Sequence, residues 1–252
     1  LFFNMITPGR SVGGEPLKAY FLHKKYKKPK TIFLSSIISD KFFHIVSQLI
    51  LVFASALFIL GFFNLPLGSR IFFEVLCIIL GFILLIIFAL FIFKKEISFM
   101  PLISFFYHFL FKRFVKLKKE KINYLKKRFK QFWMIFYENI YRRRIAILSI
   151  ILSFLFWMFF GLSSYFLFLS FGYKMNFIYV FVIAIMSQFI GDISISPGGF
   201  GFTEGSLVLL YSAVGVPLSV SALVAISASL FYYFFGMVIG GICSFYLRFK
   251  FN

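Results

Sequence analysis

Charged residues are scarce in this sequence of 252 residues, and acidic ones especially so. Charged residues make up 14% of the chain, with 8 Asp and Glu against 27 Lys and Arg, whereas hydrophobic residues make up 61% and Phe alone occurs 43 times. A water-soluble domain cannot bury that much apolar surface, because too few polar residues remain to cover it. The composition therefore excludes a soluble globular protein and predicts an integral membrane protein.

Cysteine and histidine are also rare, with 2 and 3 residues. Cys77 and Cys243 lie in separate apolar runs without C-x-x-C spacing, so the sequence predicts no disulfide framework. The histidines lack the spacing of a zinc site, and no phosphate-binding loop, G-x-G-x-x-G or G-x-S-x-G motif is present. We therefore predict no metal, no cofactor and no catalytic residue. This favours a non-enzymatic role and leaves an enzymatic one open.

The chain begins with Leu1 rather than methionine, and no charged segment followed by a short apolar core and a cleavage site opens it. From this we expect a fragment shortened at its N-terminus, and we predict no signal peptide. Residues 1–252 are expected to form a single transmembrane domain.

Long apolar runs dominate the rest of the sequence. A bilayer core requires about 20 apolar residues per spanning helix, and the stretches that reach or approach this length are 42–63, 71–93, 145–171, 177–195 and 216–249. Two shorter stretches, 1–22 and 198–216, contain Pro-Gly breaks and are typical of half-helices or re-entrant segments. The predicted fold is all-α and polytopic, with about five to seven transmembrane or re-entrant helices.

Basic residues are concentrated in 23–30, 94–95 and 112–144, whereas the connectors 64–70 and 172–176 carry one basic residue each. This alternation follows the positive-inside rule, so we expect the basic loops on the cytoplasmic side of a multi-pass plasma-membrane protein. The net charge of +19 would suggest a nucleic-acid partner for a soluble protein. Its distribution along this chain argues against nucleic acid.

The basic segment 112–144 also has helical periodicity. Its apolar residues step by three or four and are Ile122, Leu125, Phe129, Phe132, Phe136 and Ile140. Such spacing places them on one face of a helix, which predicts a basic amphipathic helix in the cytoplasmic membrane interface. The segment would act as a topology anchor, or would attract anionic lipid toward a transport path at about 1 kcal/mol per basic residue.

An internal repeat relates the two Pro-Gly breaks. Residues 7–22, TPGRSVGGEPLKAYFL, and residues 196–211, SPGGFGFTEGSLVLLY, align without a gap, so that Pro8 matches Pro197 and Glu15 matches Glu204. Proline fixes φ and glycine permits turns closed to other residues, while the glutamate falls where a helix N-terminus favours a carboxylate. We predict non-helical backbone at 197–201 and a helix that restarts near residue 203 or 204.

Four acidic residues lie in or beside the apolar segments: Glu15, Asp40, Asp192 and Glu204. Ionisable groups at membrane depth face the protein interior or a water-filled path, although each could also be an interfacial or capping carboxylate. Arg10 and Lys18 are their nearest cationic partners by motif. We predict that the two repeat motifs meet around one shared polar pocket.

These motifs, together with "SSIISDKF" at 35–42, resemble the membrane region of lysylphosphatidylglycerol synthases. The first motif matches at Pro8, Arg10, Gly14, Glu15 and Lys18, and the second at Pro197, Gly198, Gly199, Gly201 and Glu204. The first motif departs from the family pattern in the spacing after Arg10 and in having Lys18 in place of arginine. The resemblance covers essentially the whole chain and implies a stand-alone, flippase-like member.

The resemblance, together with the acidic residues, gives the candidate substrate-binding or transport residues. They are Pro8, Arg10, Glu15, Lys18, Asp40, Asp192, Pro197, Gly198, Gly199, Gly201 and Glu204. In one hypothesis the protein translocates an anionic or aminoacylated phospholipid, or a related lipid-linked substrate. In a second it is a non-transporting subunit that supports a lipid- or glycan-modifying enzyme. In a third it is an aminoacyl-phosphatidylglycerol synthase, against which the missing soluble domain argues. A homo-oligomer or a partner enzyme stays open.

The charge distribution predicts the topology. Single cysteines placed at Lys24, Lys94 and Lys119 should react with an impermeant thiol reagent from one side of the membrane, and cysteines at Pro66 and Lys174 from the other, because basic loops are retained in the cytoplasm. Labelling of positions 119 and 174 from the same side would contradict this topology.

Overall fold

The regular elements in the described part of the chain are helices. The computed structural model describes residues 14–62, 67–92, 119–194 and 196–251. In chain order, the helices are α2 (Gly14–Tyr26), α3 (Lys30–Phe62), α4 (Leu67–Ile92), α7 (Lys119–Tyr141), α8 (Arg143–Ser170), α9 (Phe177–Ile193), α10 (Phe202–Ala213) and α11 (Leu218–Phe251). This arrangement confirms a polytopic all-α protein.

Each of the five long apolar stretches coincides with one helix over most of the residues that the structure describes. The segments Lys30–Phe62, Arg143–Ser170 and Leu218–Tyr246 are long and apolar enough to cross a membrane, and Phe73–Ala89 and Phe177–Ile193 are shorter apolar helices. The interrupted stretches form the short helices α2 and α10, of 13 and 12 residues. The short helices α2 and α10 agree with the prediction, whereas α9, with 17 residues, is shorter than the span of about 20 residues expected for 177–195.

The first spanning helix begins earlier than its apolar run. We expected a span from residue 42, with Asp40 in the approach to it, but α3 already begins at Lys30. The serines at positions 35, 36 and 39 do not interrupt the helix, because each can donate its hydroxyl to a carbonyl: Ser36 to Ile32 O at 3.1 Å and Ser39 to Ser35 O at 2.8 Å, for example. Asp40 therefore lies on the exposed surface of a helix.

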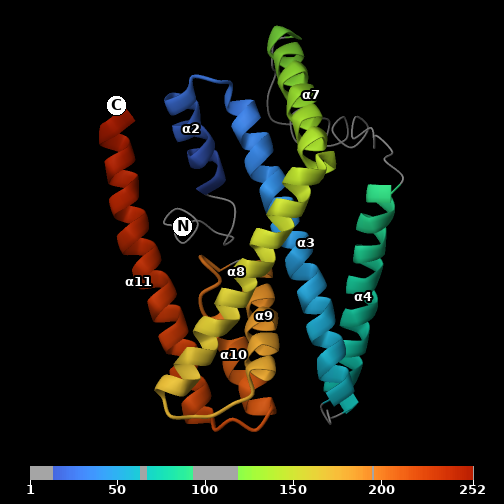
Figure 1. The fold of residues 1–252 in the computed structure, drawn as a ribbon, viewed down its shortest axis with the longest axis vertical. Coiled ribbons are helices and arrows are strands. Elements are labelled where there is room, and N and C mark those ends of the chain that lie inside the picture. The colour runs from blue at the N-terminus through green and yellow to red at the C-terminus, as the bar shows by residue number, and fades with distance from the viewer. Residues whose placement is uncertain (1–13, 63–66, 93–118, 195, 252) are drawn as a thin grey trace.

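The helices form an elongated bundle (Figure 1). The connection from α2 to α3, helix α7 and the C-terminal end of α11 lie at one end, and the connections from α8 to α9 and from α10 to α11 lie at the other. The basic segment around residues 24–30 and the basic helix α7 are thus at the same end. This agrees with the one-sided distribution of charge on which the predicted topology depends.

Helix α7 packs along the N-terminal half of α3. The Oγ of Ser35 donates to Phe132 O at 2.9 Å, and the rings of Phe42 and Phe136 meet edge to face with centroids 6.1 Å apart. The amphipathic helix predicted within 112–144 is therefore present, and α3 covers part of its apolar face. Its position at a membrane interface remains a prediction.

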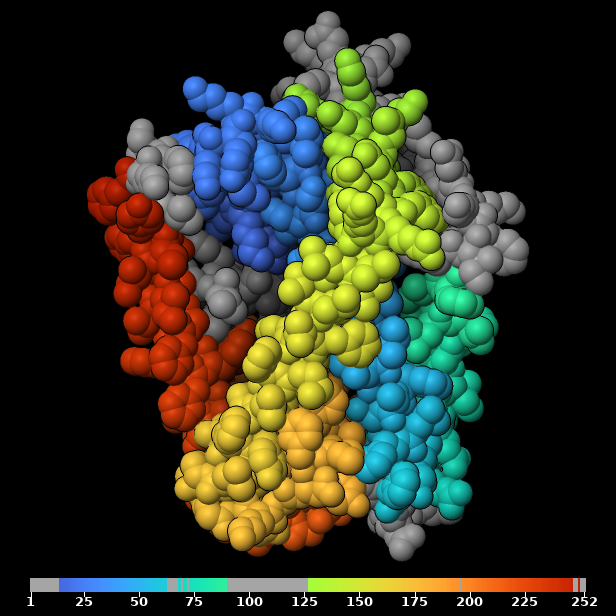
Figure 2. All heavy atoms as spheres, viewed as in Figure 1, coloured from blue at the N-terminus to red at the C-terminus, as the bar shows by residue number. Residues whose placement is uncertain are grey.

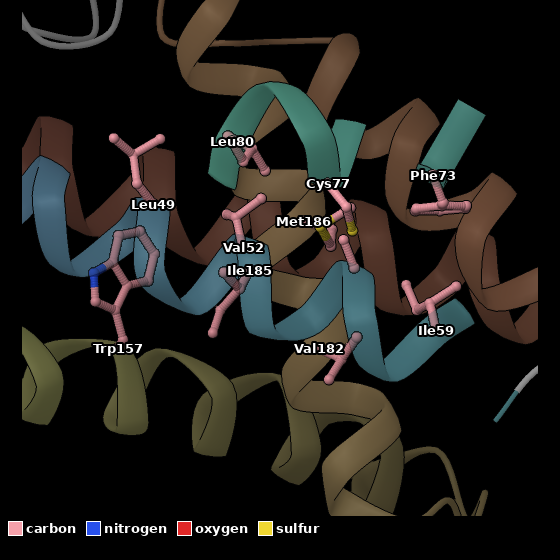
Figure 3. Packing of buried hydrophobic residues seen from close by; sticks show 11 residues of the cluster. Leu49, Val52, Ile59, Phe73, Cys77, Leu80, Trp157, Val182, Ile185 and Met186 are labelled. Carbon is pink, nitrogen blue, oxygen red and sulfur yellow. The ribbon is translucent and has the colours of Figure 1, made fainter. Parts of the chain in front are cut away.

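The main core lies where α3, α4, α8 and α9 meet (Figure 3). Val52 of α3, Leu80 of α4, Trp157 of α8 and Ile185 of α9 are buried there. A second cluster joins α8, α9, α10 and the start of α11 around Phe168 and Tyr211. These two clusters hold α9 in the centre of the bundle and fix the position of the residues at its C-terminal end.

Many large hydrophobic side chains are exposed on the outside of the described bundle. Figure 2 shows one face of the molecule, on which atoms of α8 and α11 lie at the surface. Phe82, Phe159, Phe234 and Phe245 are among many large hydrophobic side chains that are exposed, and they belong to α4, α8 and α11. Exposed aromatic and aliphatic residues at this density match a surface that contacts lipid acyl chains instead of water.

Gly161 of α8 packs tightly against the ring of Phe181 on α9. A Cβ atom added there would lie 2.2 Å from Cδ2 of Phe181, whereas a Cβ added at Gly241 of α11 would meet nothing within 4 Å. Gly161→Ala should therefore lower the free energy of unfolding by about 1–3 kcal/mol, the usual effect of overpacking. The matched change Gly241→Ala should be neutral or slightly stabilising. Thermal unfolding of both variants in detergent measures the difference, and equal melting temperatures would contradict the close approach.

Candidate functional site between the broken helices and the bundle interior

The chain leaves its helical path between α9 and α10. Helix α9 ends at Ile193, and α10 begins at Phe202 after a turn in which Gly199 N donates to Ser196 O at 3.1 Å and Phe200 N to Pro197 O at 3.2 Å. Gly198, Gly199 and Gly201 have φ values of 64°, 79° and 85°. The predicted break at 197–201 and the restart near residue 203 are both confirmed.

The Glu204 carboxylate satisfies the backbone at the start of α10. Its Oε2 accepts a hydrogen bond of 2.6 Å from Gly201 N, and its Oε1 accepts one from the hydroxyl of Ser229 on α11. Because Gly201 has no side chain, Glu204 alone forms this cap. No ion pair joins Glu204 to a lysine or arginine of the described residues.

Helix α11 also contributes a tyrosine to the break. The Tyr233 hydroxyl donates to Gly198 O at 3.0 Å, and its ring contacts Phe200 with centroids 5.5 Å apart. Ser229 and Tyr233 are four residues apart and therefore lie on one face of α11, opposite the turn. Backbone groups freed by the break thus find partners on the neighbouring helix.

A cavity of about 580 Å³ adjoins Glu204. Its walls come from α8, α9, α10 and α11 and are mainly apolar, with Phe166, Leu207, Phe231 and Phe235 among the lining residues. Polar side chains also line it, and these are Ser163, Ser164, Gln188, Thr203, Glu204, Ser229, Tyr232 and Tyr233. The size and lining are typical of a binding site for an amphipathic small molecule.

Asp192 lies at the C-terminal end of α9 in a second polar cluster. Its Oδ1 accepts a 2.9 Å hydrogen bond from Gln188 Nε2, and its Oδ2 accepts one of 2.8 Å from Gln48 Nε2 on α3. The charge of Asp192 also interacts with those of Lys41 and His44, both on α3. The His44 ring stacks on Trp157 with centroids 5.1 Å apart.

Glu15 reaches the same cluster from α2. Its carboxylate lies 3.2 Å from Nζ of Lys18 and 4.0 Å from Nζ of Lys41. Lys41 therefore interacts with both Glu15, in the first repeat, and Asp192, which lies four residues before the second repeat. Asp40 is on the exposed face of α3 but interacts electrostatically with His44.

Gln188 connects the two polar clusters. The residue is only 8% exposed, donates from Nε2 to Asp192, and lines the cavity beside Glu204. Its buried Oε1 has no hydrogen-bond partner among the described residues. A buried acceptor without a partner costs about 1–3 kcal/mol.

Sequence reasoning missed Lys41, Gln48, Gln188 and Ser229. Lys41 and the two glutamines are polar residues within largely apolar runs, a signal comparable to that of the acidic residues. Ser229 resembles the many other serines, so only the contact with Glu204 distinguishes it. Of the candidates from the first motif, Pro8 and Arg10 lie outside the described residues, and a pocket shared with Arg10 remains a prediction.

A metal centre has no support in the part of the chain that the structure describes, where no group of three His, Cys, Asp or Glu side chains could hold an ion.

Comparison with known proteins relates residues 1–240 to the family model for the transmembrane (TM) region of lysylphosphatidylglycerol synthase. A UPF0104 membrane protein of Pyrococcus horikoshii is 27% identical, and the match covers 96% of this chain and 72% of that protein. A UPF0104 membrane protein of Methanocaldococcus jannaschii is 28% identical, over 95% of this chain and 70% of the relative. No solved structure matches the chain.

The backbone at Gly201 gives a prediction for the break. Its φ of 85° and ψ of −44° are closed to other residues, whereas Gly205 is helical, and a Cβ at either position would meet nothing within 4 Å. Gly201→Ala should therefore destabilise the protein by about 1–3 kcal/mol through backbone strain alone. Gly205→Ala should stabilise it by up to about 1 kcal/mol. Thermal unfolding of the two variants should shift in opposite directions, and a shared direction would exclude the turn described.

Proposed function

The chain belongs to the family of the lysylphosphatidylglycerol synthase TM region, and from this premise we propose that it is a flippase-like protein that moves a lipid across the bilayer. The observation that carries the proposal is the Glu204 carboxylate at the wall of an apolar cavity of about 580 Å³, next to a break in the helices. A polar group in an apolar cavity offers a lipid headgroup a partner at a depth where the bilayer has none.

The cavity suits an amphipathic cargo. Its apolar walls accept hydrocarbon, and its polar residues come from α8, α9, α10 and α11. A ligand with a polar head and an apolar chain could contact both parts of the lining, whereas a wholly polar solute would leave the aromatic walls without apolar contacts. This combination favours a lipid over a soluble metabolite.

The cluster around Asp192 supplies a second polar position. It lies on the other side of Gln188 from the cavity and includes Lys41, which interacts with Glu15 and Asp192. A headgroup that leaves the cavity would therefore meet further charged partners before it reaches the basic end of the bundle. That end would attract anionic phospholipid from the adjacent leaflet, since each basic residue near such a surface contributes about 1 kcal/mol.

A reconstituted translocation assay tests the proposal. The purified chain is placed in liposomes that contain a small fraction of fluorescent phospholipid, and the loss of fluorescence after an impermeant reductant is added reports lipid movement. We expect the wild-type chain to accelerate this movement relative to empty liposomes. Glu204→Ala should slow it by about tenfold or more, because the change removes hydrogen bonds to a charged group that are worth about 1.5–3 kcal/mol.

Glu74→Ala is the matched control, since Glu74 is an exposed glutamate on α4 whose partner is Arg70 at 3.1 Å. The rate of lipid movement in this variant should equal that of the wild type. If liposomes with the wild-type chain lose fluorescence no faster than empty liposomes, translocation is contradicted. That result would favour a subunit that supports a lipid-modifying enzyme. Transfer of an aminoacyl group to lipid by the purified chain would instead identify a synthase.

A further inference from the structure

The internal repeat continues through the long helix that follows each motif. In the first repeat the short helix α2 leads into α3, and in the second the short helix α10 leads into α11. Lys41 and Ser229 each stand eleven positions after the first residue of their long helix. Lys41 contacts the repeat glutamate Glu15, and Ser229 contacts its counterpart Glu204. The two hairpins, each made of a short and a long helix, therefore have the same internal arrangement.

The two hairpins run in opposite directions through the bundle. The connection from α2 to α3 lies at the end that carries α7, whereas the connection from α10 to α11 lies at the other end (Figure 1). Both short helices thus begin toward the middle of the bundle, with Glu15 and Glu204 near those starts. Inverted repeats of this kind allow one repeat to move relative to the other.

The two short helices are packed unequally. In α10 the buried residues include Leu207 and Tyr211, and the Tyr211 ring meets that of Phe168 on α8 with centroids 4.7 Å apart. In α2 the buried residues are Gly14 and Ala19, and no described residue of this helix belongs to a buried apolar cluster. Helices in lipid are held together by side-chain packing, so α2 has fewer contacts to lose on moving than α10 has.

The C-terminal end of α2 stays close to α3. Lys30 Nζ, at the start of α3, lies 4.9 Å from the centroid of the Tyr20 ring. Within the turn itself, His23 Nδ1 lies 2.6 Å from Lys28 O. The connection consists of residues 27–29 alone, so this end of α2 can turn but cannot move far from α3.

The N-terminal end of α2 is joined to α3 by an ion pair. Glu15 lies 4.0 Å from Lys41 Nζ, across the two helices, whereas its pair with Lys18 lies within α2 and would move with that helix. The side chains of Glu15 and Lys41 are 14% and 24% exposed, so water and salt screen this pair less than a surface pair. Lys41 also interacts with Asp192 on α9, which keeps the lysine in place.

From these observations we infer that α2 is a gate, which pivots about residues 27–29 while α10 stays in place, and that the ion pair between Glu15 and Lys41 is its latch. Opening of the gate would uncover Lys41 and the Asp192 cluster beside it. The inference rests on the proposed function only for what passes the gate, a lipid headgroup on its way between the cavity and the adjacent leaflet.

The test measures the accessibility of two buried positions. Ala19 of α2 is 1% exposed, and Ala225 of α11, in the apolar cluster that holds α10, is 0% exposed. In the full chain with Cys77→Ala and Cys243→Ala, one cysteine is placed at position 19 or 225, and mass spectrometry follows its reaction with methanethiosulfonate ethylammonium in mild detergent. The cysteine at 19 should react at least about tenfold faster, because labelling of a buried site follows the population of its open form. Complete reaction of both chains in sodium dodecyl sulfate controls for reagent and detection.

Variants of Lys41 test the latch. Lys41→Ser gives the first hairpin the residue that the second one has, and it should raise the labelling rate at position 19 by about fivefold or more. Lys41→Arg keeps the positive charge and should leave the rate close to that of the wild type. Arg70→Ser is the control, since it removes the basic member of an ion pair within α4, and it should not change the rate. Position 225 should be unaffected by all three.

The wild-type comparison decides the result even if Lys41→Ser does not fold. Equal rates at positions 19 and 225 would overturn the gate, and a rate at 19 that is the same in Lys41→Ser and Lys41→Arg would overturn the latch. Labelling as expected without lipid movement in the liposome assay would leave the gate standing and refute the proposed function alone. Lipid movement with position 19 protected would refute the gate alone.

Discussion

The turn between α9 and α10 needs hydrogen-bond partners that hydrocarbon does not offer, and much of the surrounding structure follows from supplying them. Glu204 accepts a hydrogen bond from the N–H of Gly201, and Tyr233 donates one to the carbonyl of Gly198. Ser229 then ties Glu204 to α11, which holds α11 against the turn. The cavity lies beside these contacts, and Glu204, Ser229 and Tyr233 are part of its lining.

The acidic residues of the bundle are stabilised in different ways. Glu15 is paired with Lys18 and Lys41, Asp192 accepts from two amides, and Glu204 accepts from a backbone N–H and a hydroxyl. Amides and hydroxyls orient a carboxylate without cancelling its charge. Asp192 has Lys41 as a cationic neighbour, whereas no ion pair within the described residues balances the charge of Glu204.

Much of this arrangement could be predicted from the sequence, because lipid imposes strict rules on helix length and backbone breaks. The apolar runs predicted the long helices, and Pro197 with its following glycines predicted the turn before α10. The start of α3 was misjudged, since serines and Asp40 lower hydropathy without preventing a helix. Ser229 could not be assigned, because its importance comes from a contact with Glu204 on another helix that no sequence spacing encodes. Gln188 was overlooked although it lies four residues before Asp192, a spacing at which side chains on one helix meet.

The shortness of α10 has a consequence for depth. A helix of 12 residues is about 18 Å long at 1.5 Å per residue, whereas the hydrocarbon core of a bilayer is about 30 Å thick. The far end of α10 leads into the connection to α11 at the end of the bundle where α8 turns into α9 (Figure 1). Glu204, at the start of α10, would therefore lie near the bilayer midplane, so a headgroup held there has already crossed roughly half of the barrier to the opposite leaflet.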